Sequence, residues 1–470
     1  MQTQVQNETI ENSIELAKLY GILKYLTDGQ LTHVPFSLSP YKISAADLKE
    51  MTELTAPFSE LMISISQNWD FLEHHLEPIA KIDPFLRMLM DCRTDEITQS
   101  KQLLVQRNDF FLIKDEHKKT EQGQSGDLTE SNFAESALRQ VELNTVSASF
   151  PFLITQISNL HRYLFKQNQL PEIIPNNPLS PVVDAFAKSV RDYGSPDGVM
   201  LMISQPSEGN RFDQLGLEQL LWDKHKISTV RKTLADVFKS GCLRQGHLVL
   251  GGKIVALSYY RAGYTPDDYR TIEAVKGRQL IESSSTIQVP DLQMQLAGMK
   301  KIQQVLTRPE ILSNFTSAET SKHLLKTFAK MHTLDEIIEI PGGEMQAAEW
   351  VSGNPENYVL KPQREGGGNN YFGSEIPKIL KTIKQDEQNA YILMEKILAQ
   401  THSAVLVVNG CAERLTSVSE VGRYGICFAD NGVLNSNKDA GYLVRTKAEN
   451  INEGGVCAGF ACLNSLTLES

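Results

Sequence analysis

Apolar residues recur every three or four positions in three stretches of the first hundred residues, at 13–26, 44–76 and 84–101. This spacing places apolar side chains on one face of a helix, so it predicts a packed helical layer. Ser44 precedes the second stretch and Asp47 follows three residues later, which is typical of a helix N-terminus. Runs at 103–113 and 138–150 are strand-like, and 152–165 again has helical period. The intervening 114–136 is charged and contains Gly and Ser, which indicates a solvated excursion.

A different alternation begins near residue 198. An apolar strand is predicted over 198–204 and a helix over 218–226, followed by two alternating runs within 247–261. Gly251 and Gly252 separate these runs, and a glycine pair in that place is a hairpin signal. Residues 198–299 are therefore predicted to form an α/β module inserted between an N-terminal part, 1–197, and a C-terminal body, 300–470.

From residue 295 onward, helices and strands alternate. The pattern predicts helices over 295–306, 321–332 and 376–387, and strands over 358–362 and 390–398. A last group of antiparallel strands is predicted at 404–410, 412–421, 424–430 and 441–447, with Asn431 and Gly432 as a turn pair. We find no internal repeat and no low-complexity tract.

Composition narrows the possible partners. The 470 residues are 41% apolar and 22% charged, as in a folded globular protein of several domains. A formal charge of −11 does not supply the basic surface that nucleic acid requires, so no nucleic-acid partner is expected. The six cysteines include no CxxC pair, which favours a reducing compartment. The first residues lack a signal-like pattern and no run is long enough to cross a bilayer, so we expect a cytoplasmic protein without a membrane partner.

The segment 361–370, KPQREGGGNN, directly follows a predicted strand. Three consecutive glycines let backbone N–H groups approach an anion closely, and Lys361 and Arg364 supply positive charge. A phosphate-binding loop is one interpretation, and a plain surface turn is the other. The chain contains neither GxxxxGK[ST] nor GxGxxG, so a phosphate site here requires another architecture.

Two oxygen ligands are predicted to point the same way from residues 141–144. In a strand, Glu142 and Asn144 lie on one face and Leu143 turns toward the core. Mg²⁺ prefers oxygen donors and commonly combines one or two carboxylates with nucleotide phosphates, so these residues and Glu365 are candidates for a magnesium site. The alternative is an exposed polar face of a strand.

Seven segments carry a resemblance to a known family: KPQREGGGNN, VELNTVSASF, RAGY, QLAGMKKIQQ, ILMEKI, SEVGRYG and RTKAENINEGGV. From about Pro35 to Gly459 the chain resembles eukaryotic-type glutathione synthetases. The resemblance implies an α/β (α+β) fold of the ATP-grasp type with a circularly rearranged chain order. It further implies a helical N-terminal layer, an inserted α/β substrate domain, a glycine-rich lid at about 335–415, and a homodimer.

The resemblance also places ATP and magnesium. Glu142, Asn144 and Glu365 would hold Mg²⁺, with two ions per active site, in agreement with the oxygen-ligand interpretation. Lys300 and Lys361 would neutralise the phosphates, although the pattern alone does not distinguish Lys300 from Lys301. The implied ATP contacts are Glu142, Lys300, Lys361, Pro362, Gln363, Arg364, Glu365, Gly366, Gly367, Gly368, Asn369, Asn370, Phe372, Met394, Glu395, Lys396, Ile397, Glu420, Lys447 and Glu453.

The peptide substrate implied by the family is γ-glutamylcysteine, whose two carboxylates and ammonium group call for guanidinium groups, a carboxylate and polar donors. Arg107, Arg445 and Lys361 would be catalytic, and Arg445 with the backbone of Val456 and Cys457 would hold glycine. For any single Arg or Ser, a surface ion pair or a cap is the alternative. The implied substrate contacts are Arg107, Ser147, Ala148, Ser149, Phe150, Glu208, Gly209, Asn210, Gln214, Arg261, Ala262, Gly263, Tyr264, Arg445, Val456 and Cys457.

Several positions depart from the family pattern. The family usually has Asp at the positions of both Ala262 and Glu453. It usually has Tyr where this chain has Phe372, and a small residue, usually Ala, where this chain has Cys457. Phe150 is followed by proline where two glycines are common. We expect these departures to affect substrate specificity more than nucleotide chemistry.

The resemblance implies ATP-dependent ligation of γ-glutamylcysteine and glycine to glutathione, ADP and phosphate, through an acyl phosphate and without a protein nucleophile. Two alternatives stay open. The acceptor could be β-alanine or serine, which the Cys457 and Ala262 departures motivate. From a different class, the chain could be a regulatory homologue that binds nucleotide without catalysis.

Overall fold

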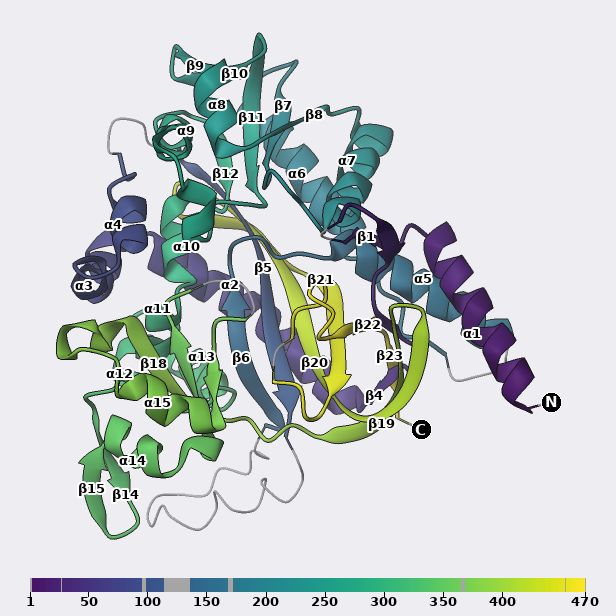
Figure 1. Cartoon of the computed structure of the whole chain (residues 1–470). Helices are drawn as coiled ribbons and strands as arrows, with labels where there is room; N and C mark the ends of the chain where they lie inside the picture. The colour runs from purple at the N-terminus through teal and green to yellow at the C-terminus, as the bar shows by residue number, and fades with distance from the viewer. Residues whose placement is uncertain are drawn as a thin grey trace.

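The computed structural model describes residues 2–26, 28–94, 99–113, 136–167, 172–364, 368–452 and 454–469. Its framework is a sheet with strand order β19-β3-β22-β21-β20-β5-β6 (Figure 1). The first part of β20 also pairs with β19, so five of these strands close on themselves. The strands are β3 (Phe36–Ser37), β5 (Lys101–Leu112), β6 (Leu138–Asn144), β19 (Thr401–Val408), β20 (Cys411–Asp430), β21 (Val433–Ala448) and β22 (Cys462–Asn464).

Helices cover both faces of this central sheet. Leu104 of β5 packs into a core with α2 (Ala45–Ser66), α3 (Trp69–Ala80) and α4 (Pro84–Met90), whereas Leu103 and Val105 pack with α5 (Pro151–Gln167) and α6 (Leu179–Tyr193). This alternation is the period of two that strand geometry imposes. α1 (Gln2–Leu19) packs on α5. Ser44 caps α2 by accepting from the Asp47 N–H at 3.0 Å, so that sequence prediction is confirmed.

Short elements complete the body. The helices α10 (Leu292–Ala297), α11 (Lys300–Leu306), α12 (Pro309–Leu312) and α13 (Ala318–Leu325) extend the core on the α2 side. Two small ladders flank the sheet: β1 (Leu23–Tyr25) with β2 (Leu31–His33), and β4 (Tyr41–Ile43) with β23 (Leu466–Leu468).

The predicted inserted module contains a second sheet of order β8-β7-β11-β10-β9, with β12 beside β11 (Figure 1, top). Leu201 and Ile203 of β7 face α8 and α9, whereas Met200 and Met202 point into the core shared with α5 and α6. The module is therefore fused to the body through a common core. Its elements are β7 (Val199–Ile203), α7 (Arg211–His225), β8 (Thr229–Lys232), α8 (Leu234–Ser240), β9 (Gly241–Arg244), β10 (His247–Leu250), β11 (Lys253–Tyr260), a 3₁₀ turn at Pro266–Tyr269, α9 (Ile272–Glu282) and β12 (Ile287–Val289).

A third sheet, of order β13-β18-β16-β17, has its own small core and lies within and beside the predicted lid range (Figure 1, green). β16 ends where the glycine-rich segment begins, so this sheet presents that segment to the body. The elements are β13 (Met331–His332), the hairpin β14 (Ile337–Ile340) and β15 (Gly343–Gln346), α14 (Ala347–Gly353), β16 (Tyr358–Pro362), β17 (Tyr371–Phe372), α15 (Ile376–Leu380) and β18 (Tyr391–Glu395), with 3₁₀ turns at Pro355–Asn357, Gly373–Glu375 and Gln385–Ala390.

Both predicted two-residue hairpins are confirmed. Gly251 and Gly252 join β10 to β11 with φ of 57° and 80°, and Asn431 and Gly432 join β20 to β21 with φ of 49° and 77°. Left-handed backbone at both turn positions matches the twist of the flanking strands, and glycine or asparagine adopts it at least cost.

The two strands predicted at 412–421 and 424–430 are wrong as separate elements, because β20 runs unbroken from Cys411 to Asp430. Gly422, between the two predicted strands, and Gly425, within the second, permit the close approach of neighbouring side chains. A Cβ on Gly422 would lie 2.3 Å from Asp109 Oδ1, and a Cβ on Gly425 would lie 2.7 Å from Ser59 Oγ.

Several predicted helices are shorter or divided. The helix predicted over 13–26 ends at Leu19, and the chain continues into β1. The helix predicted over 44–76 divides at Asn68, which caps α3. The one predicted over 84–101 is helical only to Met90. The stretch 295–306 divides at Gly298, where a Cβ would lie 2.2 Å from Thr145 Oγ1. The helix expected over 321–332 ends at Leu325, and the one over 376–387 ends at Leu380.

No helix within the described ranges combines the length and the apolar composition needed to cross a membrane. The predicted excursion over 114–136 lies outside the described residues except for Ser136.

Close packing of α8 on α9 generates a stability prediction. A Cβ on Gly277 would lie 1.9 Å from the backbone oxygen of Leu234, which cannot rotate away. We expect Gly277→Ala to destabilise the protein by about 3 kcal/mol, the upper end of overpacking costs, as a lower urea midpoint.

Gly353→Ala is the matched control, since nothing lies within 4 Å of its Cβ position at the end of α14. It should leave the midpoint unchanged or raise it slightly. Equal midpoints for the two variants would contradict the packing argument.

Candidate functional site

A cavity of about 680 Å³ opens where the central sheet, the sheet of the predicted inserted module and the third sheet meet. Strands β5, β6, β20 and β21 form its floor, β16 and β18 one side, and the segments 205–210 and 454–460 the other. Most of the residues predicted from the sequence line it: Arg107, Glu142, Asn144, Ser147, Ser149, Phe150, Glu208, Gly209, Asn210, Arg261, Tyr264, Lys300, Lys361, Gly368, Asn370, Phe372, Met394, Glu395, Lys396, Ile397, Glu420, Arg445, Lys447, Val456 and Cys457.

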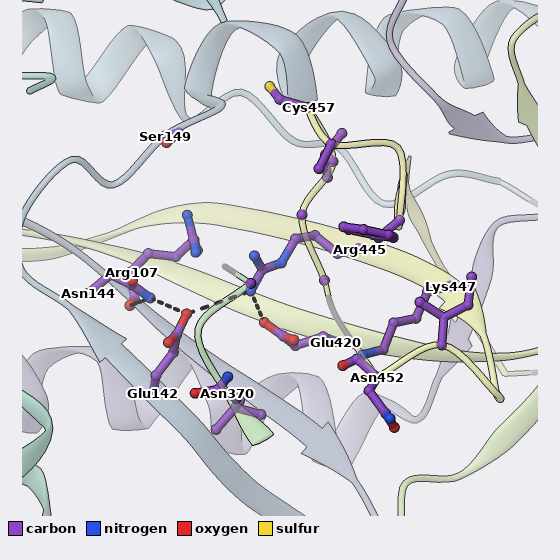
Figure 2. Close-up of a pocket in the computed structure, with 18 of the residues that line it drawn as sticks. Arg107, Glu142, Asn144, Ser149, Asn370, Glu420, Arg445, Lys447, Asn452 and Cys457 are labelled. Atoms are coloured by element: carbon purple, nitrogen blue, oxygen red, sulfur yellow. Dashed lines mark hydrogen bonds and ion pairs between the residues drawn. The ribbon is translucent and has the colours of Figure 1, made fainter. Parts of the chain in front are cut away.

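A charged centre occupies the floor of the cavity (Figure 2). The Arg445 guanidinium lies between Glu420, to which it donates a hydrogen bond, and Glu142, whose Oε1 is 3.9 Å from Nη2. Asn144 Nδ2 donates to Glu142 Oε1 at 3.3 Å, and Leu143 between them is buried in the core. The predicted common face of Glu142 and Asn144 is confirmed.

The charges of this centre set the protonation states of the Glu142 and Glu420 carboxyl groups. Burial alone would raise the pKa of Glu142, but the positive charges of Lys300, Arg445 and Lys361 outweigh it and lower this pKa to about 2. Burial raises the pKa of Glu420, and the charge of Arg445 opposes that rise. Glu142 is therefore a carboxylate at neutral pH, the form that holds a cation.

Beneath this centre lies a residue that the sequence did not single out. Asp109 is fully buried and accepts hydrogen bonds from both guanidinium groups, those of Arg107 and Arg445, and from the Asn144 amide. Its position two residues after Arg107 on the same strand face was the available signal.

The two lysines that the sequence predicted to neutralise phosphates come from two different elements. Lys300, at the start of α11, donates to the Arg364 carbonyl oxygen, and Lys361 of β16 donates to the Val141 carbonyl oxygen at 3.2 Å. Lys301 does not line the cavity, so the structure separates the two neighbouring lysines. Met394 is buried and Lys447 Nζ donates to the Asn452 carbonyl oxygen at 2.5 Å. Two cationic side chains thus flank the Glu142 carboxylate from outside the central sheet.

The opposite end of the cavity carries Ser149 and Cys457 (Figure 2). The Ser147–Phe150 loop contains two left-handed residues, Ser147 with φ 53° and Phe150 with φ 76°. Buried Asp213 holds this loop by accepting from the Phe150 N–H at 2.9 Å, and Arg261 Nη1 donates to the Ser147 carbonyl oxygen at 3.0 Å. These contacts stabilise a loop in which proline follows Phe150.

Some predicted residues are held elsewhere and do not line the cavity. The Ala262 side chain lies in the core of the inserted sheet, and Arg364 pairs with Asp83, the N-cap of α4. Gln214 Nε2 donates to Glu208 Oε2 at 2.6 Å, so it contacts a lining residue rather than the cavity. The predicted residues that do not line the cavity are Ala148, Gln214, Ala262, Gly263, Pro362, Gln363, Arg364 and Asn369. Glu365, Gly366, Gly367 and Glu453 lie outside the described residues.

Further lining residues were not predicted. Most are neighbours of recognised segments, so position next to a motif was their only signal. They are Phe111, Val141, Val146, Gln205, Val359, Leu398, Ala399, Val418, Glu449, Ile451, Asn452, Gly454, Gly455, Ala458 and Phe460.

The oxygen atoms of Glu142 and Asn144 fit a hard cation such as Mg²⁺ whose remaining ligands are phosphate oxygens. Within the described ranges, no group of three or more His, Cys, Asp and Glu side chains is arranged to hold a metal ion. Glu142 supplies a carboxylate, and the Asn144 nitrogen is committed to Asp109 and Glu142, which leaves the amide oxygen for a cation. Mg²⁺ bound by one or two protein oxygens plus phosphates is compatible with this set.

Fold and site define a mixed α/β protein with one charged cavity shared by three sheets. The chain matches the family described as eukaryotic glutathione synthase, ATP binding domain, over residues 3–468. It is 36% identical over 453 residues to the chloroplastic glutathione synthetase of Solanum lycopersicum, covering 93% of this chain and 78% of that protein. It is 35% identical over 448 residues to the glutathione synthetase of Homo sapiens, covering 93% and 90%. This chain belongs to the eukaryotic glutathione synthetase family, as its sequence segments predicted.

The fold is also found in a solved structure. A glutathione synthetase-like effector from Globodera pallida, in its apo form, superposes with a TM-score of 0.75 over 99% of this chain and 97% of that one, at 18% identity. The overall arrangement of sheets and helices is therefore shared by proteins of very different sequence.

Cys457 generates a prediction about thiol reactivity. Desolvation within the cavity raises the pKa of its thiol to about 11 and the charge of Glu208 adds to the rise, while the residue as a whole keeps an exposed surface that a reagent can reach. At pH 7.5 only about one thiol in three thousand is then a thiolate, the reactive form. We expect its alkylation by iodoacetamide, followed by mass spectrometry of peptides, to be slow at pH 7.5 and to accelerate about tenfold per pH unit up to pH 10.

Cys242, which is exposed outside the cavity, is the internal control for reagent quality. A rate for Cys457 that levels off near pH 8 would contradict the predicted protonation.

Proposed function

We propose that this chain is a glutathione synthetase, an ATP-dependent ligase that joins γ-glutamylcysteine to glycine. The observation that carries the proposal is the cavity itself. In one space it combines an ionised carboxylate, two lysines that flank it and two guanidinium groups, in a chain that belongs to the corresponding family.

The chemistry follows from the charges. The terminal carboxylate of γ-glutamylcysteine attacks the γ-phosphorus of ATP, giving an acyl phosphate and ADP, and the glycine amine then displaces phosphate. Arg107 steadies the reacting carboxylate, Lys300 and Lys361 neutralise phosphate oxygens, and Arg445 binds the glycine carboxylate. Positioning and charge neutralisation are sufficient, so no protein nucleophile is required.

For magnesium we propose Glu142, Asn144 and Glu365 as the protein ligands of two ions. When bound, Mg²⁺ neutralises charge on the transferred phosphoryl group. The ionised state of Glu142 and the fixed amide orientation of Asn144 support this assignment.

The glycine-rich segment is proposed as a lid over ATP, because an acyl phosphate exposed to water hydrolyses. Its anchoring supports this role. β16 leads into the segment, and Arg364 at its start is paired with Asp83 of the body.

We propose a cytoplasmic location, supported by six cysteines that are all free. The tomato relative is named chloroplastic, so fractionation of the source cells decides between the two compartments.

The proposed reaction predicts a specific pattern of turnover. Purified protein with Mg²⁺, ATP and γ-glutamylcysteine should release ADP in the presence of glycine and form glutathione, identified by mass. Preference for β-alanine or serine would assign a different acceptor, which Cys457 beside the cavity end motivates. ATP binding without ADP release for any acceptor would favour the regulatory homologue and contradict the proposal.

Glu142→Gln is the matching inactive variant, since it removes the carboxylate charge without changing the shape. We expect kcat to fall at least about a hundredfold, with excess Mg²⁺ restoring little. Glu413→Gln, at an exposed position of β20, is the control and should behave as the wild type.

For the oligomeric state of the protein, we propose a homodimer. Tyr25, Leu26 and Leu31 around the β1–β2 hairpin, and Leu215 and Trp222 on α7, are large apolar side chains that are partly exposed. Hairpin and helix are neighbours, because Tyr25 packs on Phe212 of α7 with ring centroids 5.7 Å apart. Sedimentation velocity at micromolar concentration should give about twice the chain mass of 52.6 kDa, and Leu31→Asp should give the monomer. A monomeric wild type would contradict the homodimer.

A further inference from the structure

Asp109 connects two ends of the site through a single carboxylate. Arg107 Nε donates to Oδ1 and Arg107 Nη2 to Oδ2, both at 2.7 Å, while Arg445 Nη2 donates to Oδ2 at 3.0 Å. Asn144 Nδ2 adds a fourth hydrogen bond to Oδ2 at 3.1 Å. Asp109 is 0% exposed and does not line the cavity, so it acts only through these three side chains.

We propose that Asp109 is a positioning residue that sets the Arg107 and Arg445 guanidinium groups at one fixed separation, and so couples the peptide site to the glycine site. The inference deepens the proposed function and rests on it for the identity of the two substrates. Asp109 also holds the Asn144 amide, so it acts on one proposed magnesium ligand as well as on the two guanidinium groups.

The sheet register makes this arrangement possible. Asp109 pairs with Glu142 of β6 on one side and with Gly422 of β20 on the other. A Cβ on Gly422 would lie 2.3 Å from Asp109 Oδ1 and 2.8 Å from Arg107 Cδ. Only glycine at that position leaves room for the fork of Arg107 on Asp109.

The negative charge of the Asp109 carboxylate is what holds the two guanidinium groups near one another. Arg107 and Arg445 repel one another; Arg107 is buried, and the Arg445 side chain is 15% exposed. A carboxylate that accepts from both removes the repulsion and fixes the donors that remain for ligand carboxylates. Without it, each guanidinium would turn toward another acid, Glu142 or Glu420, and away from substrate.

A purely structural role for Asp109 predicts something different. A buried ion pair that only supports the fold changes stability when it is removed, and it leaves the Michaelis constants of the folded enzyme unchanged. The two roles are therefore separated by how KM and kcat respond.

The test is Asp109→Asn, which preserves shape and removes the charge. We expect KM for γ-glutamylcysteine and KM for glycine each to rise at least about tenfold at saturating ATP and Mg²⁺, and KM for ATP is measured in parallel because Asp109 also holds Asn144. Asn108→Ala is the control. Asn108 is equally buried on the same strand, but it accepts from Gln140 and does not line the cavity, so all three constants should be unchanged. A wild-type KM for either amino-acid substrate in folded Asp109→Asn would overturn the inference.

A second variant decides the case in which Asp109→Asn does not fold. Gly422→Ala keeps every charge but displaces the Asp109–Arg107 fork, and it should raise the same two Michaelis constants. Gly425→Ala is its matched control, since it crowds Ser59 of α2, and it should lower stability without changing KM. Unchanged constants in Gly422→Ala would overturn the inference.

Crystal structures separate this inference from the proposed function. In whichever of the two variants folds, the guanidinium groups of Arg107 and Arg445 should both leave their wild-type positions. Unmoved guanidinium groups would overturn the inference, whatever the activity. Absence of turnover in the wild type with every acceptor would instead refute the proposed function.

Discussion

The structure depends on the mutual compensation of charges buried in the middle of its central sheet. Arg107 and Arg445 are matched there by Asp109, Glu142 and Glu420. An uncompensated buried ion costs several kcal/mol, so the strands that carry these groups must align in one register. A slip of one residue would turn the charged side chains into the apolar cores that cover both faces of the sheet.

That compensation extends beyond the central sheet and brings the third sheet into the site. Lys300 of α11 and Lys361 of β16 keep Glu142 ionised from outside the sheet, and they donate to the backbone oxygens of Arg364 and Val141. The third sheet is therefore attached to the body through the same charges that, in the proposed function, would receive a nucleotide and its metal.

Glycines mark the places where this arrangement leaves no space. Because it has no Cβ, Gly422 leaves space for the Asp109–Arg107 pair. Gly425 does the same for α2, and Gly298 for the Thr145 side chain. Gly422 and Gly425 lie within β20, and Gly298 lies in the turn that ends α10. The hydrophobic and polar pattern did not locate these close approaches: the helix predicted over 295–306 ran through Gly298, and β20 was predicted as two strands.

The sequence by itself determined the mixed α/β class, both glycine or asparagine hairpins, the cap at Ser44, the common face of Glu142 and Asn144, and the family. These follow from local geometry and from motifs, which neighbouring residues carry. The tertiary structure decided the continuous β20, the separation of Lys300 from Lys301, the burial of Ala262 and the place of Asp109. Each of these depends on contacts between residues far apart in the chain, and local periodicity contains no information about such contacts.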